Sequence, residues 1–96
     1  MSDLRTADRK YILTLFISGM SVSSMRAVEN LKLILEEYLK DEYSLKIIDI
    51  NKEPKSLAEN DIIVCPTLVK QQPAPMKRIV GDLSDKAKVL KALGLE

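Results

Sequence analysis

The sequence predicts a single α/β domain with a four-stranded mixed sheet, in the order strand, helix, strand, short helix, strand, strand, helix. Three observations predict this class. Residues 11–17 form a short run of β-branched and aromatic residues, as in a central strand. Residues 22–39 repeat apolar side chains at helical spacing, and a second apolar run follows at 45–50. A crossover of this length favours parallel pairing of the two strands.

Composition narrows the function classes. The 96 residues carry a net charge of +1, which gives no general attraction to nucleic acid or to an anionic membrane. One cysteine, Cys65, excludes an internal disulfide, and the absence of histidine removes zinc sites and imidazole catalysis from consideration. We therefore expect a cytoplasmic, non-enzymatic protein without cofactor or metal, one domain over 1–96 with a flexible N-terminus at 1–9.

The first helix, predicted over residues 22–39, has one charged side and one apolar side. Its exposed side carries charges, with Glu36 and Lys40 as a favourable i, i+4 pair, and a serine is expected to cap its start. The apolar stripe comprises Val22, Met25, Val28, Leu31, Leu35 and Leu39.

Prolines mark turns and element boundaries in the second half of the sequence. Pro54 suits the first turn of a short helix at 55–60, and residues 62–70 form a strand that Pro66 interrupts. A polar, proline-rich turn at 71–75 leads to a strand at 76–80, so these two strands form a hairpin. Ser84 is expected to cap a last helix with Ala87, Val89, Leu90 and Leu93 on its buried side.

This order, with a proline opening the third strand, resembles the thioredoxin-like fold, in which the corresponding proline is cis. The resemblance implies a cis peptide at Pro66, facing the loop 18–24. Redox thioredoxins open the following helix with Cys-x-x-Cys, and here Ser21 and Ser24 occupy those positions. A serine hydroxyl supplies neither the thiolate nor the resolving thiol that the redox reaction requires.

The sequence also resembles the KaiB family of circadian-clock proteins over nearly its whole length. The run 73–84, Pro-Ala-Pro-Met-Lys-Arg-Ile-Val-Gly-Asp-Leu-Ser, carries this resemblance most strongly. Further matching stretches are 11–19, Arg26-Ala27, 45–49, Pro54 and 66–68.

The KaiB resemblance implies a regulator that docks on the N-terminal ATPase ring of the hexameric ATPase KaiC, in a clock or a clock-derived stress-response system. It also implies relationship to the sensor domain of the kinase SasA, which competes for that surface; a KaiA-like or SasA-like protein is a further candidate partner. KaiB-like chains adopt two folds, a tetrameric ground state and a thioredoxin-like binding state, so function depends on their populations. Self-association of this chain as a dimer or tetramer stays open.

Several residues depart from the cyanobacterial KaiB pattern. Ala92 replaces a helix-interior glycine, which favours the helix by roughly 0.8–1 kcal/mol. Gly94 and the shortened end also point to the thioredoxin-like state, so we expect that fold to predominate over the alternative KaiB ground state. Asp61 stands where the pattern is basic, and Cys65 where it has a small or hydroxyl residue.

Four cations match basic positions of the family, and we expect them to form the docking patch: Arg26, Lys46, Lys77 and Arg78. The alternative for each is a solvated surface charge. Two alternative functions stay open, a thioredoxin-like thiol protein that uses Cys65 and an oligomeric adaptor for another partner; Cys65 is otherwise expected to be a buried, small apolar residue.

Overall fold

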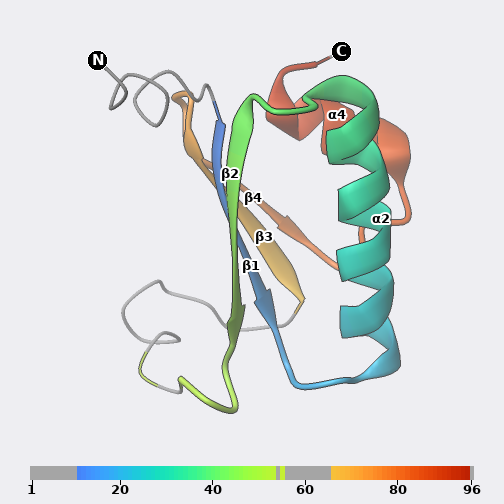
Figure 1. Cartoon of the computed structure of the whole chain (residues 1–96), viewed down its shortest axis with the longest axis vertical. Coiled ribbons are helices and arrows are strands. Elements are labelled where there is room, and N and C mark those ends of the chain that lie inside the picture. Colours follow the sequence, from blue (N-terminus) through green and yellow to red (C-terminus); the bar gives the residue numbers. More distant parts are fainter. Residues whose placement is uncertain (1–10, 54, 56–65, 96) are drawn as a thin grey trace.

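The computed structural model describes residues 11–53, 55 and 66–95. A four-stranded sheet lies to the left of two helices that cover the same face of it (Figure 1). The elements are β1 (Tyr11–Ile17), α2 (Val22–Tyr38), β2 (Tyr43–Asp49), β3 (Thr67–Gln72), β4 (Lys77–Val80) and α4 (Lys86–Leu93).

The sheet has the order β2-β1-β3-β4, with β1 and β3 in the centre. β2 runs parallel to β1, whereas β3 is antiparallel to both β1 and β4. The α/β class, the mixed four-stranded sheet and the β3–β4 hairpin are therefore confirmed. The strand after the first helix begins two residues earlier than expected, at Tyr43, and ends at Asp49.

The helix α2 has the predicted length and the predicted cap. Ser21 is the N-cap, and its hydroxyl oxygen accepts a hydrogen bond from the Ser24 N–H. Leu31 and Leu35 point into the core with no measurable exposure, whereas Glu36 is exposed. Periodicity thus identified the buried side in the second half of this helix, but it was wrong at the start, where Val22 and Met25 of the predicted stripe are 70% and 43% exposed and Ala27 is buried instead.

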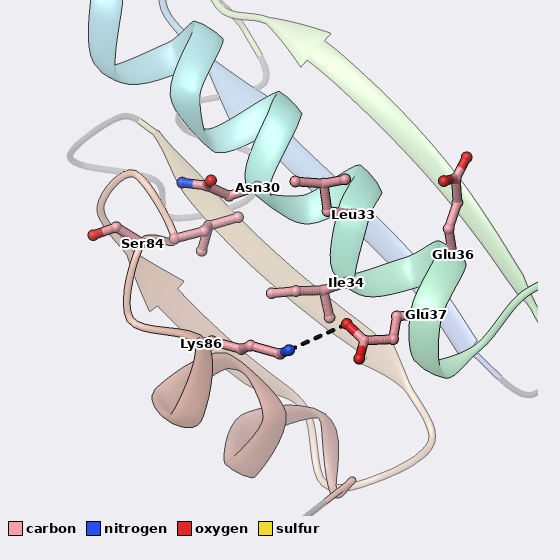
Figure 2. Close-up of a pocket in the computed structure, with 8 residues that line it drawn as sticks. Asn30, Leu33, Ile34, Glu36, Glu37, Ser84 and Lys86 are labelled. Carbon is pink, nitrogen blue, oxygen red and sulfur yellow. Dashed lines mark hydrogen bonds and ion pairs between the residues drawn. The ribbon is translucent and has the colours of Figure 1, made fainter.

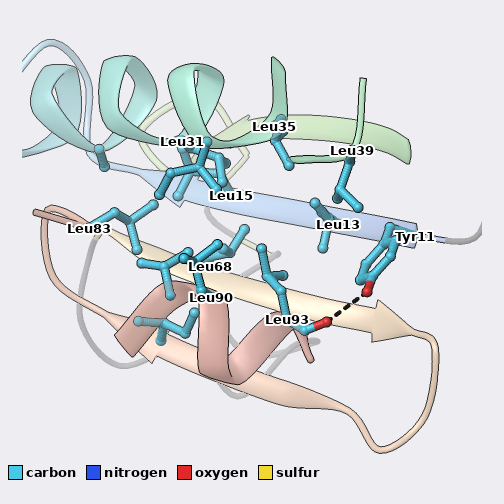
Figure 3. Packing of buried hydrophobic residues seen from close by; sticks show 14 residues of the cluster. Tyr11, Leu13, Leu15, Leu31, Leu35, Leu39, Leu68, Leu83, Leu90 and Leu93 are labelled. Carbon is cyan, nitrogen blue, oxygen red and sulfur yellow. Dashed lines mark hydrogen bonds between the residues drawn. The ribbon is translucent and has the colours of Figure 1, made fainter. Parts of the chain in front are cut away.

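The main core fills the space between the sheet and the two helices (Figure 3). Its centre is aliphatic, and each fully buried large side chain contributes about 1.5–3 kcal/mol relative to exposure. A hydrogen bond of 2.8 Å from the Tyr11 hydroxyl to the Leu93 carbonyl ties the start of β1 to the end of α4. The fully buried large members are Leu13, Leu15, Leu31, Leu35, Leu68, Val89 and Leu93.

The opposite face of the sheet carries a smaller cluster. Phe16, Ile48 and Val69 are buried there, with Ile50 packed against them. Successive residues of a strand point to opposite faces, so β1 contributes to both clusters. This agrees with the expectation that β1 is a central strand covered on both sides.

The last helix differs from expectation at its start. Asp85, not Ser84, is the N-cap, and its carboxylate accepts the Lys88 N–H at 3.1 Å. Ser84 instead donates its N–H to the Asp82 carboxylate at 3.0 Å, so it belongs to the preceding turn. A carboxylate is an equally good cap, which explains why sequence alone could not choose between neighbouring candidates.

The two terminal positions singled out in the sequence have separate roles. Ala92 lies inside α4 and packs partly against the core. Gly94 ends the helix in the left-handed region, with φ of +76°, and its N–H reaches the Leu90 and Lys91 carbonyls. This is the conformation that glycine adopts most readily at a helix C-terminus.

Several expectations fall on the part of the chain outside the described residues. These are the N-terminal segment 1–9, the short helix at 55–60 apart from Lys55, and the residues Asp61 and Cys65. The cis prediction for Pro66 concerns its bond to Cys65 and so lies outside them too. Pro66 itself is buried and accepts a hydrogen bond from the Gly81 N–H at 3.0 Å. The described cis bonds are Gln72–Pro73 and Ala74–Pro75.

Candidate functional site

The loop between β1 and α2 leads to the two serines that the sequence predicts to stand at the redox positions. Ser24 is 1% exposed, and its hydroxyl oxygen accepts the Ser18 N–H at 3.1 Å and the Ser21 hydroxyl at 2.8 Å. Since Ser21 in turn accepts the Ser24 N–H, the two hydroxyls satisfy each other and the loop backbone. They act as a helix cap and a loop brace, which are structural roles.

A carboxylate holds the other side of this loop. Asp49 Oδ1 accepts the Gly19 N–H at 3.1 Å and the Asn51 N–H at 2.9 Å, so the turns after β1 and β2 share one acceptor. Gly19 has φ of +58°, and a Cβ there would meet the Asn51 side chain at 3.0 Å. Hydrogen bonds to Asp49 therefore tie this loop to the turn after β2.

The four predicted docking cations do not lie on one face. Lys46 is opposite Thr14, Thr14 is opposite Val69, and Val69 is opposite Arg78. Directly opposed residues of neighbouring strands share a face, so Lys46 and Arg78 lie in one row across the sheet, about 14 Å apart by strand spacing.

The other two cations lie on the helix side of the sheet. Lys77 precedes Arg78 in β4 and so points to the opposite face, where α2 carries Arg26. All four side chains are exposed. The structure thus places two of the four cations on each side of the sheet without bringing Arg26 and Lys77 together, since Arg26 lies near Asp82, beyond the far end of β4. Their part in docking stays a prediction.

A further cation, Lys70 on the hairpin, was not among the four predicted docking residues. It is 5% exposed and lies directly opposite Lys77. Leu68, two residues earlier, belongs to the main core, so strand alternation places Lys70 on the same face. That alternation was visible in the sequence and could have flagged a lysine at an inward position.

A groove lies between α2 and α4 and is bordered by residues of both helices (Figure 2). Its volume is about 590 Å³, and Ile34 and Leu83 are its buried residues. Lys86 bridges the two helices through an ion pair of 3.1 Å to Glu37, with its ammonium 5.1 Å from the centre of the Tyr38 ring. The lining residues are Asn30, Leu33, Ile34, Glu36, Glu37, Leu83, Ser84 and Lys86.

Two ionisable groups beside this groove have shifted pKa values. The hydrogen bond to Glu37 raises the pKa of the Lys86 ammonium above its ordinary value, with Tyr38 contributing in the same direction. Hydrogen bonds from Ser84 lower the pKa of the Asp82 carboxyl, and the charge of Arg26 adds to this. Both groups are fixed in their charged forms, which suits structural contacts and not proton transfer at neutral pH.

Within the described part of the chain, no group of three or more metal-ligating side chains comes together. No described helix is long and apolar enough to cross a membrane.

Fold and loop together define the class: a thioredoxin-like protein with hydrogen-bonded serines at the start of α2. The thioredoxin Deadhead of Drosophila melanogaster has the same fold, with a TM-score of 0.73 at 17% identity, over 97% of this chain and 87% of that one. The N-terminal domain of Synechococcus elongatus SasA matches with a TM-score of 0.72 at 25% identity, over 92% of this chain and 87% of that one.

The family follows from the sequence comparison. The family model for the KaiB domain matches residues 14–95. The circadian clock oscillator protein KaiB of Prochlorococcus marinus subsp. pastoris is 48% identical over 93% of this chain and 83% of that protein. The chain therefore belongs to the KaiB family, and its described residues have the thioredoxin-like fold that the sequence predicted.

Proposed function

We propose that the chain is a non-enzymatic clock-type regulator that docks on the N-terminal ATPase ring of a KaiC-type hexameric ATPase and modulates its phosphorylation cycle. Membership of the KaiB family carries this proposal. The likeness to the SasA N-terminal domain supports it, because the KaiB resemblance implies that SasA competes for the same ring surface. The serine-closed loop is consistent with a scaffold used for binding and not for thiol exchange.

On this proposal, basic side chains make the contact with the ATPase ring. Arg26, Lys46, Lys77 and Arg78 are exposed, and the residues that separate Lys46 from Arg78 in their row are neutral. Two of these cations lie on each side of the sheet, so a flat ring surface contacts the cations of one side closely and those of the other at its margin. Charge reversal on each side separately identifies the side in contact.

On this proposal, the C-terminal helix α4 determines the fraction of chains that have the thioredoxin-like binding fold. Ala92 is a better helix former than glycine, and Gly94 fits the left-handed C-terminal position without strain. A preference of about 0.8–1 kcal/mol from Ala92 corresponds to roughly a fourfold to fivefold shift in population. The chain should then bind with a correspondingly smaller conformational cost.

The test is direct mixing with the matching KaiC-type ATPase and ATP, followed by native mass spectrometry after hours of incubation. A complex of chain and hexamer is the expected result. The variants R26E/K77E and K46E/R78E are compared with K52E, which reverses an exposed lysine in the turn after β2. No complex with the unmodified chain refutes the partner, and equal binding by all variants refutes the basic docking surface.

A further inference from the structure

Two lysines of the β3–β4 hairpin face each other directly. Lys70 and Lys77 are register partners in adjacent strands, and Lys70 is also opposite Leu13 of the main core. Both side chains therefore rise from the helix-bearing face, at the end of the sheet where Tyr11 bonds to the end of α4. Like charges directly opposite each other destabilise a sheet, so this pairing is unfavourable for the isolated chain.

Lys70 is held much more firmly than a surface lysine. The residue is only 5% exposed, yet its ammonium has no hydrogen bond or ion pair anywhere in the described structure, and neither does that of Lys77. Among described side chains, the one buried atom without a hydrogen-bond partner is Gln71 Oε1, so the Lys70 ammonium keeps contact with solvent. The stem is packed while the charge emerges, as expected of a lysine at the rim of a core.

The hairpin itself supplies no counter-charge to the pair. Residues 66–81 contain no aspartate or glutamate. Met76, directly before Lys77, is 57% exposed at the turn of the hairpin. Two directly opposed cations complement a carboxylate, and the packed stem of Lys70 lowers the side-chain entropy that binding costs.

We propose that Lys70 and Lys77 form a binding site for an acidic segment of a protein partner. A protein fits better than nucleic acid, because the hairpin 66–81 has no aromatic residue on which a base could stack. This inference rests on the proposed function only in taking that segment to belong to the docked ATPase.

The test uses the full chain and two fluorescent peptides, one alternating glutamate with leucine and one with glutamine in place of glutamate. Fluorescence anisotropy should show the glutamate peptide binding about tenfold more tightly, with this preference weakening in high salt. K70M should lose about tenfold in affinity for the glutamate peptide, whereas K52M, at an exposed lysine outside the hairpin, keeps it.

Stability separates a binding lysine from a structural one. Methionine preserves the packed stem of Lys70, so K70M should unfold at the same or a higher temperature, because it removes a partly buried unpaired charge. A clear fall in its Tm would show an internal partner for the ammonium and would overturn the proposal.

The remaining outcomes are equally decisive. Equal affinity for the two peptides, or binding of a single-stranded oligonucleotide in place of the glutamate peptide, overturns the acidic-protein site. Peptide binding that depends on Lys70, in a chain that forms no complex with the ATPase, keeps the site and refutes the proposed function. If K70M still forms the complex with the ATPase, and the unmodified chain does not bind the glutamate peptide, the site is refuted and the proposed function is kept.

Discussion

The loop after β1 and the β3–β4 hairpin use polar residues in opposite ways. In the loop, Ser21, Ser24 and Asp49 direct their oxygens to one another or to backbone N–H groups. In the hairpin, Lys70 and Lys77 carry charges that no described group neutralises.

This difference distinguishes polar groups that stabilise the fold from polar groups that are available to bind a partner. At the start of α2, where the sequence predicts the positions of a redox pair, the chain has a hydrogen-bond network that stabilises it. Groups whose bonding capacity is already satisfied have little to offer a partner, whereas an unpaired, immobilised cation has much. We therefore locate recognition on the hairpin.

The largest effect is expected from reversing the hairpin charges. K70E/K77E should weaken binding to the KaiC-type ATPase by about thirtyfold or more, because carboxylates would then face the acidic segment. S21C/S24C, which restores thiols at the loop, should bind as the unmodified chain does. Surface plasmon resonance on the immobilised ATPase measures the affinity of both variants. A loss of binding in S21C/S24C alone would contradict the assignment of recognition to the hairpin.

The next effect is on stability. S24A should lower the free energy of unfolding by about 1–3 kcal/mol, because it leaves the Ser18 N–H without its acceptor in a partly buried loop. S23A, at an exposed neighbour on the same helix turn, should change it by less than about 0.5 kcal/mol. Urea denaturation measures both variants, and equal values would deny the loop its bracing role.

A smaller effect is expected at the end of α4. A92G should cost about 0.8–1 kcal/mol of helix stability. G94A should cost roughly 1–2 kcal/mol, because alanine tolerates the left-handed backbone poorly, while G94N should cost less. Backbone chemical shifts of 66–95 report whether the lost stability appears as a second fold. Unchanged stability in both A92G and G94A would remove these residues from the account of fold preference.

The smallest effect is a pH dependence at the turn before α4. The pKa of Asp82 is lowered in the folded chain, so its contribution is present above the unfolded value of 3.8 and is lost as pH falls through the folded value. D82N should therefore flatten the acid limb of the stability profile slightly. Thermal unfolding between neutral and acidic pH checks this, with D41N, at an exposed aspartate after α2, as the control.

Sequence reasoning reached the fold because its main signals are local. The α2 stripe and the run 11–17 predicted the correct elements, and Ser21 is the cap of α2 as a serine cap was expected to be. Ser84 failed as a cap because Asp85 is an equally suitable neighbour, and only the turn geometry separates them.

The candidate site was harder to predict because it depends on pairing between strands. The sequence alone does not show that Lys46 and Arg78 share a face, since this needs the register of three strand pairs. The inward facing of Lys70 could have been predicted from strand alternation with Leu68, but the degree of its burial depends on packing that the sequence does not show.

The central claim, that the hairpin is the recognition surface, can be tested without a substitution. Methionines report on both regions: Met76 lies on the hairpin, and Met20 and Met25 lie at the start of α2, all three exposed. In methyl-labelled chain bound to the KaiC-type ATPase, we expect the Met76 signal to shift while those of Met20 and Met25 keep their positions. A shift of Met20 and Met25 with Met76 unchanged would contradict the account.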